Sequence, residues 1–197
     1  MKFARITLSD RASAGVYEDR SGPAIEDFFA GRLAEPIEWV RVLIPDEREQ
    51  IESALRKICD GERCALAVTT GGTGPSPRDV TPEATRSVLD RELPGFGEIL
   101  RVQSFPKVPT SILSRSTAGT RGQTLIVNLP GNPKAIGECL PLLLPAIIEC
   151  LDHLGPPRPA LRRFIHRAST SPPFVARACR TSGSPSSGPP ATPTPGG

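Results

Sequence analysis

One unbroken apolar run constrains the fold of this chain more than any other feature. Residues 64–70 read CALAVTT, an apolar stretch followed directly by two hydroxyl residues. A strand without a polar residue at every second position is typical of a sheet that is covered on both faces. We therefore expect this segment to be a buried strand inside a layered domain.

Further strands and helices alternate along the chain on either side of this run. β-rich segments at 3–8, 37–44 and 123–129 predict three more strands. Helical patterns begin near Ser21, Asp46 and Thr81, within ELPGFGEIL at 92–100, and after PGN at 130–132, and Gly61 ends the second of them. We expect Ser21 and Thr81 to cap their helices, and Pro141 and Pro145 to kink or divide the last helix. The alternation predicts an α/β fold with a mostly parallel sheet and helices on both faces.

Charge and composition change abruptly near residue 155. Residues 1–155 carry 18 basic and 21 acidic residues, whereas residues 156–197 carry six arginines, no acid and ten prolines. A segment so poor in apolar residues cannot bury enough surface to offset the entropy of ordering it. We predict a folded domain at 1–155 and a Pro/Ser/Arg-rich, largely disordered tail at 156–197.

The remaining composition bears on partners and location. The domain is mildly acidic and the chain has one Trp and one Tyr, so we expect no nucleic-acid partner. No apolar run reaches the roughly 18 residues of a membrane span, so we expect no membrane partner. The first residues, MKFARITLSDR, contain charges throughout, so we expect no signal peptide. Five cysteines without CxxC spacing indicate reduced thiols, and we expect a cytoplasmic protein.

Three unusual loops each follow a predicted strand. SDRASAG comes after the first strand, TGGTGPSPRD after the buried run, and LPGNPK after the strand at 123–129. Ligands of open α/β sheets bind outside the carboxyl ends of the strands. We therefore expect the three loops to form one composite site.

The glycine-rich loop favours a phosphate ligand. Gly71, Gly72 and Gly74 tolerate positive φ and leave room for a ligand, while backbone N–H groups and the start of the next helix supply positive charge. The segment is neither GxGxxG nor a Walker A loop, so a plain tight turn remains the alternative interpretation.

Acidic and basic residues near these loops have a functional and an ordinary interpretation each. Asp79 and Asp46 could bind Mg²⁺ beside phosphates, or serve as turn and capping residues; Asp46 with Glu49 resembles a capping box. Ser9 and Asp10 could line the site or only shape a turn. The candidate partners for phosphate charge, each of which could equally be a solvated cation, are Arg78, Arg115, Arg121 and Lys134.

Histidine chemistry is not predicted for this site. His153 and His166 lie at the end of the domain and in the tail, away from the glycine-rich loop. Carboxylates, hydroxyls, amides and a metal ion remain, and these suffice for phosphoryl or nucleotidyl transfer, which depends on positioning and charge neutralisation.

Six motifs in order identify a family resemblance over roughly residues 4–155. They are LSDRASAGVYEDRSGPAI, LIPDE, TTGGTGPSPRDVTPEAT, LPGFGE, ILSRSTAGTRG and NLPGNPKAI. Together they resemble the molybdopterin-binding domains of molybdenum-cofactor biosynthesis, most closely the Mog-type molybdopterin adenylyltransferases, and the G domains of gephyrin and its plant counterpart. The tail has no equivalent in this resemblance.

The resemblance implies a fold, an assembly and a reaction. The fold would be a three-layer α/β/α sandwich that assembles as a homotrimer. The reaction would transfer AMP from ATP to molybdopterin, with Mg²⁺ as cofactor and release of pyrophosphate, and the product could pass to a molybdenum-inserting protein. The substrate's own terminal phosphate would be the nucleophile, so no nucleophile of the enzyme is needed.

The resemblance also assigns residues. Asp46 and Asp79 would be catalytic and would bind the metal ion. Substrate or nucleotide binding would involve Ser9, Asp10, Gly71, Gly72, Thr73, Gly74, Thr81, Pro82, Glu83, Gly131, Asn132, Pro133 and Lys134. Two alternatives remain: a non-catalytic molybdopterin carrier of the same fold, and an interaction scaffold of the kind formed by fused relatives.

Overall fold

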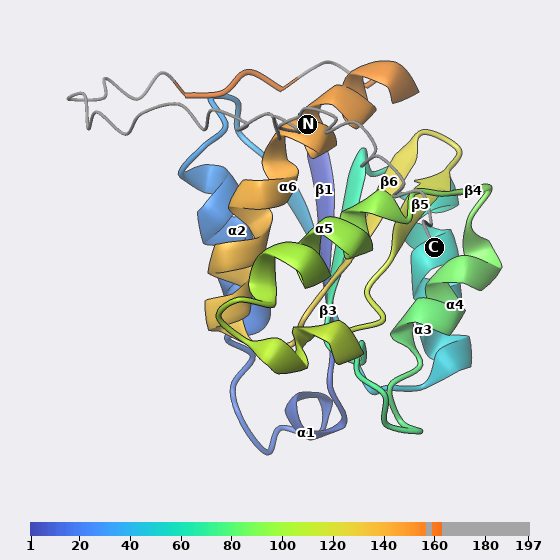
Figure 1. Cartoon of the computed structure of the whole chain (residues 1–197). Helices are drawn as coiled ribbons and strands as arrows, with labels where there is room; N and C mark the ends of the chain where they lie inside the picture. Colours follow the sequence, from blue (N-terminus) through green and yellow to red (C-terminus); the bar gives the residue numbers. More distant parts are fainter. Residues whose placement is uncertain (157–158, 163–197) are drawn as a thin grey trace, which may run out of the picture. The chain divides into compact units, whose positions relative to one another are not determined.

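The computed structural model describes residues 1–156 and 159–162 (Figure 1). Within the predicted tail at 156–197, residues 157–158 and 163–197, and with them His166, lie outside the described residues. The division at residue 155 stays a prediction. The strands are β1 (Lys2–Leu8), β2 (Glu38–Ile44), β3 (Leu66–Thr70), β4 (Arg91–Glu92), β5 (Ala118–Arg121) and β6 (Thr124–Leu129).

The helices occupy the connections between these strands. They are α1 (Asp10–Ser13), α2 (Ser21–Ala30), α3 (Arg48–Arg56), which continues as the π-helical turn η1 (Lys57–Gly61), α4 (Thr81–Val88), α5 (Gly95–Ser104), the short 3₁₀ helix η2 (Pro109–Leu113) and α6 (Pro133–Leu154). The predicted three-layer α/β/α sandwich is confirmed.

The sheet is parallel in the half that carries the predicted site. Its strand order is β2-β1-β3-β6-β5-β4, and the first four strands run parallel. Thr7 lies opposite Thr70, and Thr70 lies opposite Leu129. The carboxyl ends of β1, β3 and β6 therefore reach the same edge of the sheet, the edge at which α1 lies in Figure 1.

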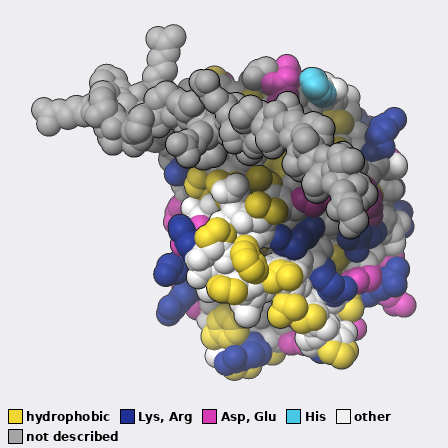
Figure 2. Space-filling model, in the orientation of Figure 1, with side chains coloured by type: hydrophobic (Ala, Val, Ile, Leu, Met, Phe, Trp, Pro, Cys, Tyr) yellow, Lys and Arg dark blue, Asp and Glu magenta, His cyan; other side chains and the backbone are white. Residues whose placement is uncertain are grey.

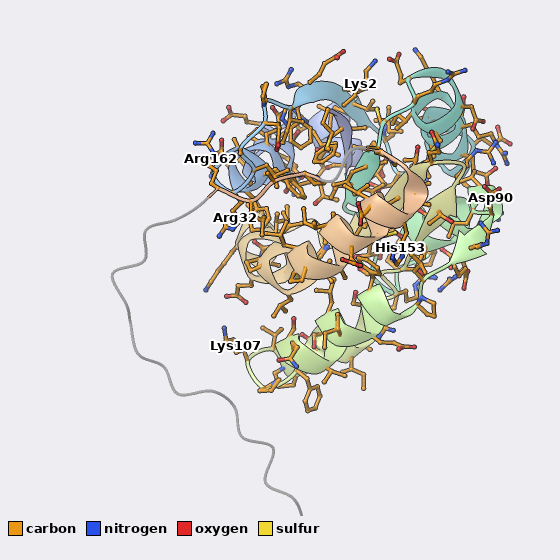
Figure 3. The ribbon with its side chains drawn as sticks, turned by 90° about the horizontal axis from the view of Figure 1, so that it is seen from above. Lys2, Arg32, Asp90, Lys107, His153 and Arg162 are labelled. Atoms are coloured by element: carbon orange, nitrogen blue, oxygen red, sulfur yellow. The ribbon has the colours of Figure 1, made fainter. Side chains whose placement is uncertain are left out.

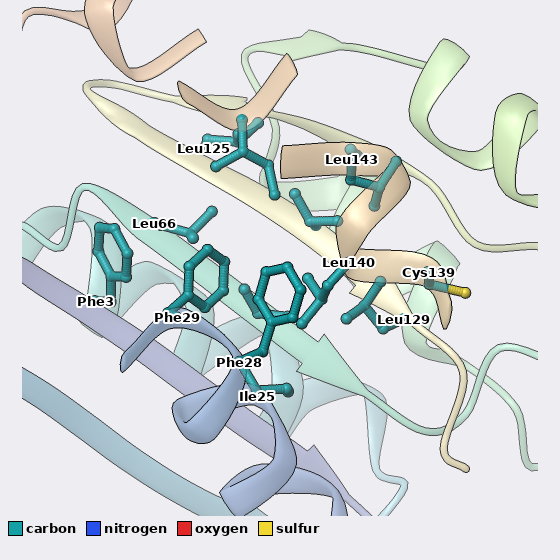
Figure 4. Close-up of a cluster of buried hydrophobic side chains, with 14 of the residues drawn as sticks. Phe3, Ile25, Phe28, Phe29, Leu66, Leu125, Leu129, Cys139, Leu140 and Leu143 are labelled. Atoms are coloured by element: carbon teal, nitrogen blue, oxygen red, sulfur yellow. The ribbon is translucent and has the colours of Figure 1, made fainter. Parts of the chain in front are cut away.

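Two apolar cores hold the layers together. Helices α2 and α6 pack on one face, where Phe3, Phe29 and Leu140 are fully buried (Figure 4). Helices α3 and α4 pack on the other face against Ile6 and Ile126. All five side chains of β3 are buried, because the strand has a core on each side. This explains the apolar run that the sequence shows.

The antiparallel edge of the sheet was not predicted. Strands β4 and β5 are two and four residues long, and β5 pairs antiparallel with both β4 and β6. Strands this short carry no readable periodicity, and both residues of β4 are exposed. Their pairing is decided by tertiary contacts instead.

The last helix is not divided at its prolines, so that part of the prediction is wrong, whereas a kink stays a prediction. Helix α6 runs continuously through Pro141 and Pro145. Both prolines are exposed, as is Gly137, whose carbonyl would be the helical partner of the N–H that Pro141 lacks. Because this face is open to water, the freed carbonyls can be solvated and the helix persists.

Two predicted helix caps are also wrong. Ser21 is the first residue of α2, and its N–H and that of Gly22 both donate to Asp19 Oδ1, at 3.1 and 2.9 Å. Thr81 likewise opens α4 without capping it. Both hydroxyls instead donate to neighbouring loops, as described below.

The start of the chain and the end of α6 lie at the edge of the sheet away from the three loops. Met1 and Gly155 line a common cavity of about 510 Å³ there. Nearby, the Arg162 N–H donates to the Arg32 carbonyl at 2.7 Å, and Figure 3 shows the two residues side by side.

Apolar side chains gather on the outer surface of α5 and η2 (Figure 2). Val102, Phe105, Val108, Ile112 and Leu113 are each about half exposed or more, with exposed fractions of 47–64%. Exposed apolar groups of this kind are typical of interaction surfaces. Among the described residues, no helix has the length and apolar character needed to cross a membrane.

Candidate active site

The three loops that the sequence singles out meet at the carboxyl edge of the sheet. Gly71 lies at their centre: its N–H donates to the Leu129 carbonyl at 3.3 Å, and a Cβ on it would lie 2.2 Å from the Leu8 carbonyl oxygen. A Cβ on Gly131 would lie 3.2 Å from Gly71 Cα. The expected convergence of the loops is therefore present, and the loops pack too closely for side chains at these positions.

Hydroxyl groups fasten the loops to one another. Thr81 Oγ1 donates to the Gly71 carbonyl at 2.9 Å, and its N–H donates to the Gly72 carbonyl at 3.1 Å. Thr70 Oγ1 donates to the Pro130 carbonyl, and Ser21 Oγ to the Gly131 carbonyl, both at 2.8 Å. Hydroxyls at the end of β3 and at the start of two helices thus set the geometry of the glycine-rich loop and of the loop after β6.

The glycine-rich loop offers free backbone donors. Gly71 and Gly72 have φ of +105° and +61°, conformations that glycine adopts without strain. Within the described residues, the amides of Gly72, Thr73 and Gly74 donate no hydrogen bond. Adjacent free amides in such a turn form a concave site for an anion.

Asp46 joins this loop from the end of β2. Its N–H donates to Asp10 Oδ1, and the Asp10 N–H donates back to Asp46 Oδ2, each at 3.1 Å. The predicted capping role is wrong, because Glu47 occupies the position before α3. Asp46 Oδ1 is buried without a hydrogen-bond partner, and it lies 2.8 Å from where a Cβ on Gly72 would be.

The two linked aspartates have opposite pKa shifts. Burial raises the pKa of Asp46, and the negative charges of Asp10 and Asp79 raise it further. Arg78 holds the pKa of Asp10 below its ordinary value, mainly through its hydrogen bonds to that carboxylate. Of the two linked aspartates, Asp46 is therefore the one whose negative charge is poorly compensated.

Asp79 lies at the other end of the glycine-rich loop. Its Oδ2 accepts from the Ser76 N–H at 2.9 Å and lies 2.9 Å from where a Cβ on Gly74 would be. Asp79 is close enough to Asp46 for its charge to raise the Asp46 pKa. The loop thus carries one carboxylate of its own and faces a second one.

These residues fit a divalent cation that binds together with phosphate. Within the described residues, no three acidic, His or Cys side chains cluster so as to hold a metal ion alone. Mg²⁺ commonly takes only one or two protein carboxylates and completes its shell with water and phosphate oxygens. The unpartnered Asp46 Oδ1, with Asp79 nearby, matches that donor set.

A cavity of about 460 Å³ opens beside the loops. It is lined by Ser9, Gly131 and Pro133 of the predicted set, and also by residues that were not predicted: Thr7, Leu8, Ala12, Tyr17, Glu18, Asp19, Arg20, Ser21 and Thr70. Asp19 is the most informative of these, because it also accepts from Thr7 Oγ1 at 2.9 Å and pairs with Arg5 at 2.5 Å. An acid two residues before a Ser-Gly-Pro helix start could have indicated it.

Other predicted site residues lie at the margin. Asn132 caps α6 by accepting the Lys134 N–H at 2.9 Å, and Lys134 is exposed. Pro82 is buried in the first turn of α4. Glu83 pairs with Arg115, and both line a second cavity together with Asp79.

The remaining candidate cations are already paired. Arg78 binds Asp10 at 2.8 Å and Glu47 at 2.9 Å across the mouth of the site. Arg121 pairs with Asp60 at 2.7 Å at the opposite end of β5. His153 lies near the end of α6.

Residues 4–149 match the model of a family described as "Probable molybdopterin binding domain". The chain belongs to this family. All three loops and both aspartates lie within the matched residues.

Members and structural neighbours of the molybdopterin-binding family are close in sequence. The chain is 54% identical over 147 residues to the molybdopterin adenylyltransferase of Helicobacter pylori J99, covering 75% of this chain and 84% of that protein. It is 51% identical over 140 residues to the Escherichia coli K12 protein of the same name, covering 71% and 72%. The crystal structure of the molybdopterin biosynthesis enzyme MoaB from Thermus thermophilus matches with a TM-score of 0.71 at 43% identity, covering 78% of this chain and 95% of that one.

Proposed function

We propose that this protein is a molybdopterin adenylyltransferase, which transfers AMP from ATP to molybdopterin and releases pyrophosphate. The observation that carries the proposal is the 50–54% identity to relatives of that name, over the part of the chain that contains the three loops. The site supports it, because it combines free amides for phosphate with two carboxylates.

The reaction requires positioning more than covalent chemistry. A terminal phosphate oxygen of molybdopterin attacks the α-phosphorus of ATP; the new P–O bond forms as the bond from that phosphorus to the bridging oxygen of the β-phosphate breaks, and pyrophosphate leaves with both electrons. The free amides of Gly72, Thr73 and Gly74 would bind phosphate oxygens. Thr81 would keep these amides in place through its hydrogen bond to the Gly71 carbonyl.

Mg²⁺ would be held by Asp46 and Asp79. When bound, it would neutralise charge on the transferring and leaving phosphates. Asp46 suits this role because its buried Oδ1 lacks a partner. Asp10 would keep Asp46 in orientation through the reciprocal amide bonds.

Assembly and location remain part of the proposal. We expect a homotrimer, and the apolar surface on α5 and η2 offers a face for self-association. We also expect a cytoplasmic enzyme with no nucleic-acid or membrane partner, whose product passes to a molybdenum-inserting protein. The alternatives are a non-catalytic molybdopterin carrier and an interaction scaffold. The two carboxylates beside the loop favour the enzyme over both, because neither alternative requires them.

Adenylylation itself tests the proposal. Purified protein is mixed with molybdopterin, ATP and Mg²⁺, and adenylylated pterin and pyrophosphate are measured, with Asp79→Asn as the control. We expect product from the wild type alone. Tight molybdopterin binding without product would instead establish the carrier, and an Asp79→Asn variant with full activity would remove Asp79 from the site.

A further inference from the structure

Arg115 makes an unusual set of contacts behind the glycine-rich loop. It lies between η2 and β5, in a segment distant from the loop in sequence. Its Nε donates to the Gly74 carbonyl at 2.8 Å, its Nη2 donates to the Asp79 carbonyl, and its backbone N–H donates to the Thr73 carbonyl at 2.9 Å. Arg115 therefore holds the glycine-rich loop at three points. Two of them, Thr73 and Gly74, lie near its start, and the third, Asp79, lies near its end.

The direction of the Arg115 side chain is itself fixed. Its Nη1 pairs with Glu83 Oε1 on α4, the helix that begins directly after the loop. Arg115 and Glu83 are only about one-third exposed, at 35% and 38%. A planar guanidinium that donates to three separate acceptors has very little freedom to turn, unlike the ammonium of lysine.

The segment that carries Arg115 is anchored on its other side. Arg101 Nη1 donates to the carbonyls of Ser114 and Ser116, at 3.1 and 3.3 Å. Gly97 lies so close that a Cβ on it would lie 2.0 Å from the Ser116 carbonyl oxygen. Arg115 thus lies in a segment that is hydrogen-bonded to α5, and its own contacts join that segment to the loop.

We propose that Arg115 is a positioning residue for the nucleotidyl-transfer site: it holds the glycine-rich loop so that the Asp79 carboxylate and the free amides face Asp46 before any ligand binds. This inference rests on the proposed function. Because Arg115 directs its Nε, Nη1 and Nη2 to loop carbonyls and to Glu83, we assign its action to the loop. The Thr73 carbonyl belongs to the same planar trans peptide as the Gly74 N–H, so the bond from the Arg115 N–H also fixes the direction of that free amide.

The test uses Arg115→Lys, which keeps the charge and loses the three-acceptor geometry. Arg121→Lys is the matched control, because Arg121 also pairs with a carboxylate, Asp60, and donates to a carbonyl, that of Val88 at 3.0 Å, but at the opposite end of β5. Both variants lose a comparable set of bonds, and only one of them borders the loop.

Two readouts are compared for the full-length protein. The first is amide hydrogen exchange of residues 71–80 without substrates. The second is the Mg²⁺ concentration that gives half-maximal adenylylation. We expect Arg115→Lys to speed exchange in this segment and to raise the Mg²⁺ requirement about 10- to 100-fold, the range for loss of a residue that orients a metal ligand, with the KM for molybdopterin within about twofold. Arg121→Lys should change neither.

The outcomes separate the positioning role from plain stabilisation. Wild-type exchange in residues 71–80 of Arg115→Lys would overturn the inference, as would equal changes in both variants. If Arg115→Lys does not fold, Glu83→Gln takes its place, since it removes the ion pair and leaves the guanidinium on the loop; exchange in 71–80 should again rise. If the wild type makes no product, the proposed function fails, and the exchange comparison still decides the role of Arg115.

Discussion

Asp10 and Asp46 each donate a backbone N–H to the carboxylate of the other, and both bonds measure 3.1 Å. The pair ties the ends of β1 and β2 together and turns the second oxygen of Asp46 toward the glycine-rich loop. That oxygen is buried and has no partner. Such uncompensated groups are costly and concentrate at functional sites.

Asp46→Asn should separate stability from activity. The substitution removes the charge of a half-buried carboxylate whose pKa is raised by its partial burial and by two neighbouring acids. We expect adenylylation to fall by about 100-fold or more, while the free energy of unfolding at neutral pH stays equal or rises by about 1 kcal/mol. Chemical denaturation and the product assay measure the two effects. Asp60→Asn, far from the loops, is the control and should remain active; an active Asp46→Asn enzyme would contradict the assigned role.

Gly72→Ala should damage the site more than its backbone conformation alone predicts. At φ +61°, an alanine costs roughly 1–2 kcal/mol, and here its Cβ would also lie 2.3 Å from Thr81 Oγ1. Gly15→Ala is the matched control, because Gly15 has φ +71° but no atom within 4 Å of a new Cβ. We expect Gly72→Ala to lose more stability than Gly15→Ala in urea denaturation, and to lose activity as well. Equal losses of unfolding free energy in the two variants would contradict the prediction, because they would mean that the loop shifts to accommodate the new Cβ.

Thr81→Val tests the hydroxyl that holds the Gly71 carbonyl. Thr81 is fully buried, so valine keeps the shape and leaves that carbonyl unpaired, at a cost of about 1–3 kcal/mol. Thr124→Val offers the comparison: Thr124 is 1% exposed and donates to the Cys64 carbonyl at 2.6 Å, at the other edge of the sheet. Both variants should lose similar stability, and only Thr81→Val should raise the KM for ATP. If Thr124→Val also raised the KM for ATP, the increase would reflect general destabilisation and not the bond from Thr81 to the glycine-rich loop.

Glu26 should make stability depend on pH in the acid range. The hydrogen bonds from Arg41 are the main cause that lowers the pKa of Glu26, and Arg5 lowers it further. Because this pKa is lower in the folded than in the unfolded chain, the stabilisation is complete above the unfolded value of about 4.3 and is lost as pH falls through the folded value. The difference in unfolding free energy between the wild type and Glu26→Gln should therefore be largest near neutral pH and shrink in acid. A difference that does not change with pH would contradict the prediction.

The parts of the molecule that are encoded locally could be read from the sequence. The apolar run at 64–70 predicted β3, and the strands at 3–8, 37–44 and 123–129 agree with β1, β2 and β6 to within one residue at each end. The meeting of the three loops followed from the rule that parallel strands share a carboxyl edge. Each of these inferences needed only neighbouring residues and one rule of topology.

The parts that depend on distant residues could not be read in this way. The short strands β4 and β5, the pairing of Asp10 with Asp46, and the contacts of Arg115 with the loop all join segments that lie far apart in the chain. Ser21 and Thr81 looked like helix caps because hydroxyls commonly cap helices, but their hydroxyls serve carbonyls of other loops. Local propensity is overridden wherever such a contact is available.

Met1 and Gly155 line the same cavity, at the edge of the sheet opposite the glycine-rich loop. The start of β1 and the end of α6 therefore lie close together and away from the three loops, an arrangement typical of domains that tolerate fusion and insertion. A segment joined before β1 or directly after α6 would start at this edge, away from the loops of the site. The same arrangement makes this domain suitable for tethering to a surface or for fusion to a partner enzyme, since the attachment would leave substrate access open.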